Sequence, residues 1–101
     1  MDNRKIAIVT GGSRGIGRAI ACELASAGYY VIITYKTNDA QAQAAVATIQ
    51  DQGGAAEAVK FDVADAAEAA LQMNAICSRF QNIQVLVNNA GITADGLFML
   101  M

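Results

Sequence analysis

The sequence has 101 residues, of which 54% are hydrophobic and 16% charged, with a net charge of −2. This balance predicts one folded domain, because disordered chains are poorer in hydrophobic residues and richer in charge. Without a basic stripe we expect no nucleic-acid partner, and the apolar runs are far shorter than the roughly 20 residues that span a membrane.

The first third of the chain predicts a strand, a helix and a second strand. Residues 5–10 form a short apolar run that ends at glycines, as a buried strand does. Residues 29–35 are aromatic and β-branched, which favours another buried strand. Between these strands, apolar residues recur at helical spacing on one face: Ile16, Ile20, Leu24 and Ala27.

The remainder continues the alternation of helices and strands. Residues 38–52 predict a helix with an apolar face formed by Ala42, Ala45, Val46 and Ile49. Residues 56–61 predict a third strand and residues 84–89 a fourth. Between them, Asp65 and Glu68 resemble a capping box that opens a helix, and the apolar face of that helix comprises Ala69, Met73, Ile76, Cys77 and Phe80.

Strands that alternate with helices in this way predict an α/β fold with a parallel sheet. We expect a Rossmann-type, doubly wound sheet with strand order 3-2-1-4 in the portion present. The ligand crevice of such a sheet lies beyond the carboxyl ends of the strands, where the order of the strands reverses.

A glycine-rich loop joins the first strand to the first helix: Thr10-Gly11-Gly12-Ser13-Arg14-Gly15-Ile16-Gly17. Glycines allow a sharp turn, let a phosphate approach the backbone and let the helix press onto the sheet. The amides of the first helical turn then face a pyrophosphate. A plain glycine turn is the alternative, while the absence of a Gly-Lys-Ser/Thr sequence excludes a Walker A loop.

The spacing Thr-Gly-x-x-x-Gly-x-Gly resembles the short-chain dehydrogenase/reductase family, whose three glycines correspond to Gly11, Gly15 and Gly17. Behind the fourth predicted strand, Asn88-Asn89-Ala90-Gly91 is similar to the family's second motif. The resemblance implies that Asn88 and Asn89 fix the end of that strand and that the backbone lines the cofactor ribose. Alone, these four residues are also compatible with a turn.

The end of the second strand indicates NADP rather than NAD. NAD sites place an acidic residue there, whereas this chain has Tyr35 and Lys36 and no carboxylate before Asp39. Lys36 and Arg14 are suited to a 2′-phosphate, and a basic residue before the second glycine resembles the NADP-preferring members of the family. The alternative is that both are solvated surface charges.

Other cofactor contacts are implied by the resemblance. They include the loop residues Ser13 and Ile16, and Asp62 with Val63 after the third strand, where the family's aspartate contacts adenine. A turn or capping role for Asp62 is the alternative, and the two roles are compatible.

The tail, residues 92–101, resembles the corresponding stretch of 3-oxoacyl-[acyl-carrier-protein] reductases, and acetoacetyl-CoA reductases are similar there. This implies an NADPH-dependent oxidoreductase that reduces a 3-oxoacyl thioester, on acyl carrier protein, in fatty acid or polyketide-type synthesis. The alternatives are a short-chain dehydrogenase for acetoacetyl-CoA, a sugar or an alcohol, and a non-catalytic NADP-binding module. The resemblance also implies a homotetrameric parent protein.

No catalytic residue is assigned. The family's Tyr-x-x-x-Lys pair is absent, because Tyr29, Tyr30 and Tyr35 are followed four residues later by Ile33, Thr34 and Asp39. We therefore interpret residues 1–101 as the NADP-binding N-terminal half of a dehydrogenase, with the catalytic half absent and the chain alone inactive.

The lack of histidine and of a Cys-x-x-Cys pair argues against a metal site. Cys22 and Cys77 predict buried free thiols in a cytoplasmic protein. Without a further strand beside it, the fourth strand is expected to present Val85-Leu86-Val87 as an open apolar edge. The apolar residues 97–101 are expected to lack a packing partner, so we predict self-association of this chain.

Overall fold

A computed structural model describes residues 5–13, 15–80, 82–88 and 98–100. The predicted alternation of strands and helices is confirmed, with boundaries that differ by one or two residues. In chain order the elements are β1 (Ile6–Thr10), α1 (Gly15–Ser26), β2 (Tyr30–Tyr35), α2 (Asp39–Asp51), β3 (Ala55–Lys60), α3 (Ala66–Arg79), β4 (Ile83–Asn88) and β5 (Phe98–Leu100).

The sheet has the order β3-β2-β1-β4-β5, so the predicted order 3-2-1-4 is confirmed and extended by one strand. β1 is central and pairs in parallel with β2 on one side and β4 on the other. Thr10 at the end of β1 is in register with Thr34 and Asn88. The carboxyl ends of three neighbouring strands therefore lie at one edge of the sheet, as a nucleotide crevice requires.

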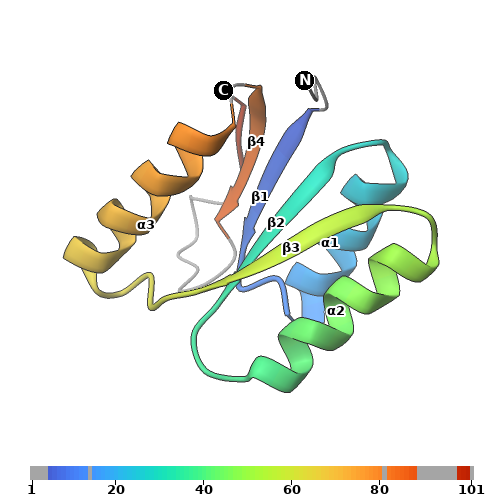
Figure 1. The fold of residues 1–101 in the computed structure, drawn as a ribbon, viewed down its shortest axis with the longest axis horizontal. Helices are drawn as coiled ribbons and strands as arrows, with labels where there is room; N and C mark the ends of the chain where they lie inside the picture. Colours follow the sequence, from blue (N-terminus) through green and yellow to red (C-terminus); the bar gives the residue numbers. More distant parts are fainter. Residues whose placement is uncertain (1–4, 14, 81, 89–97, 101) are drawn as a thin grey trace.

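Helices cover the two faces of the sheet unequally (Figure 1): α1 and α2 lie together on one face and α3 lies on the other. The first face has the larger core, in which Val9, Val31 and Ile33 pack with Ala21 of α1 and Ile49 of α2. Alternate residues of the same strands point the other way toward α3: Ile6, Ile8 and Ile32, which cluster with Ile76. Strands buried on both faces explain why their sequences are continuously apolar.

The predicted faces of α2 and α3 hold in part. Ala42, Ala45 and Ile49 of α2 are buried, as expected. On α3 only Ile76 is buried, and Cys77 is exposed, so the prediction of two buried thiols is wrong for Cys77, while Cys22 is only half-buried. A single helix on that face of the sheet buries a narrow stripe, and Cys77 lies about 100° around the helix from Ile76.

The predicted face of α1 holds for Ile20 and Leu24, which are half-buried and pack against the larger core, but not for Ile16. Ile16 is 71% exposed, and the buried residues of the helix are Gly17 and Ala21. Ile16 is the second residue of α1, next to the glycine loop that follows β1. Helical spacing identified the helix, but not the point at which the helix reaches the sheet.

The open apolar edge expected at β4 is not observed. β5 pairs with β4 in antiparallel orientation, with Val85 opposite Leu100 and Val87 opposite Phe98. Backbone pairing with the tail therefore occupies this edge, which removes the reason given for self-association through it. Within the described residues, no helix has both the length and the apolar character needed to cross a membrane.

Candidate nucleotide-binding site

A cavity of about 610 Å³ lies at the carboxyl edge of the sheet. Its volume falls within the range of about 300–1,000 Å³ that small-molecule sites occupy. The loops after β1, β2 and β3 all contribute, because parallel strands deliver their following loops to the same edge. The lining residues are Gly11, Ser13, Gly15, Thr34, Tyr35, Lys36, Thr37, Asn38, Gln41, Phe61, Asp62, Val63 and Ala64.

The glycine loop has a backbone that side chains would prevent. Gly11 and Gly15 have φ angles of 66° and 60°, in the left-handed region that glycine adopts without strain. A Cβ at Gly12 would lie 2.6 Å from Cγ2 of Ile33. Nothing lies within 4 Å of a Cβ built on Gly15, which faces the cavity. This open cradle at the start of α1 fits a pyrophosphate group.

Lys36, which directly follows β2, lines the cavity and has an ionic partner there. Its Nζ lies 3.7 Å from Oδ2 of Asp62, and its side chain is 69% exposed. At this separation and exposure the pair is weak. A phosphate could therefore attract the Lys36 ammonium away from Asp62 at little cost, with Lys36 acting as a point charge.

Asp62 has the turn role that the sequence left open, and its position is compatible with the other. Its Oδ1 accepts a hydrogen bond of 2.9 Å from the amide of Ala64, which makes it a turn residue. Its other carboxylate oxygen faces Lys36, and the residue lines the cavity together with Val63. The turn fixes the carboxylate at the cavity wall, where it can also contact a ligand.

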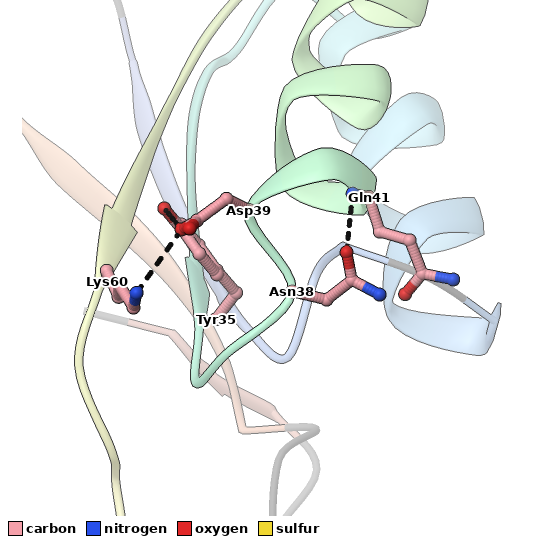
Figure 2. Close-up of polar contacts among 5 residues, drawn as sticks. All are labelled: Tyr35, Asn38, Asp39, Gln41 and Lys60. Atoms are coloured by element: carbon pink, nitrogen blue, oxygen red, sulfur yellow. Dashed lines mark hydrogen bonds and ion pairs between the residues drawn. The ribbon is translucent and has the colours of Figure 1, made fainter.

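Asp39, the first carboxylate after β2, is held by two other side chains (Figure 2). Tyr35 Oη donates a 2.8 Å hydrogen bond to Asp39 Oδ1, and Nζ of Lys60 lies 3.4 Å from the same oxygen. The hydrogen bond from Tyr35 is the main cause that lowers the pKa of Asp39 below its ordinary value; burial opposes it, and the charge of Lys60 lowers the pKa further. Next to it, Asn38 caps α2 by accepting from the amide of Gln41 at 3.0 Å.

Seven of the residues expected to contact a cofactor come together in this cavity: Gly11, Ser13, Gly15, Tyr35, Lys36, Asp62 and Val63. Ile16 and Gly17 follow directly in α1 without lining it. Asn88 ends β4 beside Thr10, whose hydroxyl donates a 3.3 Å hydrogen bond to the carbonyl of Val87. Arg14, Asn89, Ala90 and Gly91 lie outside the described residues.

Six lining residues were not anticipated from the sequence: Thr34, Thr37, Asn38, Gln41, Phe61 and Ala64. Four of them adjoin an anticipated residue in the sequence, and the other two, Asn38 and Gln41, lie at the start of α2, so strand ends and the first turn of α2 were the available signal. Among the described residues no group of three or more His, Cys, Asp or Glu side chains could hold a metal ion.

Comparisons with known proteins agree with this geometry. Residues 5–101 match the sequence profile of the short chain dehydrogenase family. Over its whole length the chain is 46% identical to a 3-oxoacyl-[acyl-carrier-protein] reductase, FabG, of Staphylococcus aureus, and the match covers 41% of that protein. A 3-oxoacyl-[acyl-carrier-protein] reductase of Synechocystis is 45% identical over 96% of this chain and 39% of its own length.

A metagenomic short-chain oxidoreductase, solved in complex with NADP, is structurally similar with a TM-score of 0.81 and 36% identity. That match covers 87% of this chain and 39% of the other. The chain thus spans about two fifths of the length of the curated relatives it matches.

Proposed function

This chain belongs to the short chain dehydrogenase family, and we propose that it is the NADP-binding part of a reductase. The proposal of NADP rests on which residues after β2 line the cavity. Lys36 lines it, and Asp39, the first carboxylate after β2, does not. NAD sites use a carboxylate at this place to bind the ribose 2′-hydroxyl, and a cation there suits a 2′-phosphate.

We further propose that the whole protein reduces a 3-oxoacyl thioester carried on acyl carrier protein. This rests on the printed activity of relatives that are 44–46% identical over nearly the whole chain. A bound nicotinamide cofactor supplies the hydride. The residues described here bind and orient its nucleotide end: the glycine loop cradles the pyrophosphate, and Lys36 attracts the 2′-phosphate.

Titration with NADPH and NADH tests the choice of cofactor. We expect NADPH to bind at least about tenfold more tightly, and Lys36→Met to weaken NADPH while leaving NADH nearly unchanged. Lys5→Met is the matched control, because Lys5 is an exposed lysine that precedes β1 at the opposite edge of the sheet. Equal affinities for the two nucleotides would overturn the assignment of NADP.

Intact mass spectrometry of the protein purified from its source tests the reductase proposal. A mass well above the 10.5 kDa of this chain, together with NADPH oxidation on a 3-oxoacyl-acyl carrier protein, is the expected result. A mass near 10.5 kDa without turnover would instead identify a nucleotide-binding module.

A further inference from the structure

Tyr35 and Lys60 end adjacent strands and converge on Asp39. They are the last residues of β2 and β3 and stand directly opposite each other in the parallel register. Figure 2 shows both side chains directed at the carboxylate that opens α2. Three elements therefore meet at one carboxylate at the edge of the candidate site.

Asp39 stands apart from its neighbours in its relation to the cavity. The five residues before it and Gln41 after it line the cavity, whereas Asp39, Ala40 and Lys60 do not. The helix cap is provided by Asn38. The contacts of Asp39 therefore do not cap α2, and its carboxylate is paired with Lys60, which like Asp39 is not among the residues that line the cavity.

We propose that Lys60 and Tyr35 are positioning residues that hold Asp39 outside the cavity and thereby set the preference for a nucleotide with a 2′-phosphate. This inference rests on the proposed function. A carboxylate free to turn toward the cavity would repel the phosphate. The same carboxylate could accept a hydrogen bond from an unphosphorylated ribose, as the acidic residue of NAD sites does.

Exposure indicates that these two contacts are what hold Asp39. The side chain of Asp39 is 64% exposed and that of Lys60 is 53% exposed, so packing does not fix either group. Removing one contact should therefore loosen the hold on the carboxylate without opening a cavity in the core. Tyr35 also lines the cavity, so its substitution changes the wall as well, and Lys60 is the cleaner probe.

The test measures dissociation constants of NADPH and NADH for the full chain and for Lys60→Met, Asp39→Asn and the double variant. We expect Lys60→Met to weaken NADPH about two- to fivefold, on the scale of one solvent-exposed charge close to a phosphate, and to tighten NADH. In the Asp39→Asn background the same substitution should change neither constant, because the charge it would release is absent. Lys60→Arg should retain the wild-type ratio of the two constants.

The double-variant cycle separates this role from a general effect of charge. An equal loss of NADPH affinity in both backgrounds would mean that Lys60 acts on the phosphate directly, and would overturn the inference while leaving the NADP proposal intact. So would an unchanged ratio of constants in Lys60→Met. A wild-type protein that binds NADH as tightly as NADPH would overturn the proposed cofactor and this inference together. Circular dichroism confirms that each variant is folded.

Discussion

Each end of β2 takes part in a cluster of a tyrosine, a carboxylate and a cation, and the two clusters differ in their surroundings. At the ligand edge, Tyr35 donates to Asp39, which also contacts Lys60. At the opposite edge, Tyr30 donates a 2.7 Å hydrogen bond to Oε1 of Glu57, which accepts a second bond of 2.6 Å from Arg79. Each cluster thus contains a tyrosine, a carboxylate and a cation drawn from separate elements.

Burial of the carboxylate distinguishes the two clusters. Glu57 is 26% exposed, and the ring of Phe80 packs against both Tyr30, at 5.6 Å between centroids, and the Arg79 guanidinium, at 4.7 Å. This cluster ties the end of α3 to β2 and β3. Asp39 is 64% exposed, whereas the two cations differ little, with Arg79 at 49% and Lys60 at 53%. Because ion pairs in water contribute little to stability, we infer that the far cluster stabilises the fold, whereas the cluster at the ligand edge shapes the electrostatics of the site.

The largest expected effect is the loss of stability when a methyl group is added to a crowded glycine, one at each edge of the sheet. A Cβ at Gly12 would lie 2.6 Å from Ile33, and one at Gly54 would lie 2.9 Å from Ile49. Both alanine variants should lose about 1–3 kcal/mol of unfolding free energy, which urea denaturation measures, because an added methyl forces a packed side chain to shift. Only Gly12→Ala should also weaken nucleotide binding. Weakened binding in Gly54→Ala would contradict the separation of the two edges.

Glu57→Gln should have the next largest effect. The amide keeps an acceptor for Tyr30 but removes the charge paired with Arg79, so we expect a loss of about 1 kcal/mol. Urea denaturation at pH 7 measures the loss, and nucleotide affinity should stay at the wild-type value. A change in affinity comparable to that of Lys60→Met would show that the far cluster acts on the site.

Acid should abolish the difference between wild type and Glu57→Gln. Burial alone would raise the pKa of Glu57, but the hydrogen bonds from Arg79 and Tyr30 outweigh it and lower the pKa. A carboxylate with a lowered folded-state pKa contributes stability above its unfolded pKa and loses it as pH falls through the folded value.

The gap in unfolding free energy should therefore be full at pH 7 and shrink below about pH 4.3, the ordinary pKa of glutamate. Denaturation of both proteins across this range measures it. A gap that stays constant to the lowest pH would show that the charge of Glu57 is not what stabilises the cluster.

The smallest expected effect is on stability at the ligand edge. Lys60→Met should leave the thermal midpoint unchanged within error, because its pair with Asp39 is exposed. Arg79→Met, the same exchange at the far edge, should lower the midpoint. Scanning calorimetry of the two variants provides the comparison, and equal shifts would mean that exposure does not separate the clusters.

Local patterns in the sequence determined most of the fold. Continuous apolar runs predicted β1 and β2, helical spacing predicted α2, and the Asp65 cap of α3 is confirmed by its 3.1 Å bond from the amide of Glu68. The alternation of these elements and the glycine loop were sufficient to predict the strand order and the edge that bears the site. These features depend on residues close together in the chain, whose periodicity and turn chemistry can be read directly.

Only the tertiary structure decided which side chains meet. Ile16 has the helical spacing of a core residue and yet is exposed, and Cys77 falls beside the narrow stripe that α3 buries. The pairing of β5 with β4 reversed the expectation of an open edge. Lys60 carried no signal of a role near the site, because its distance from Asp39 depends on the register of β2 and β3. That register is set by burial over the whole sheet, and no local pattern contains it.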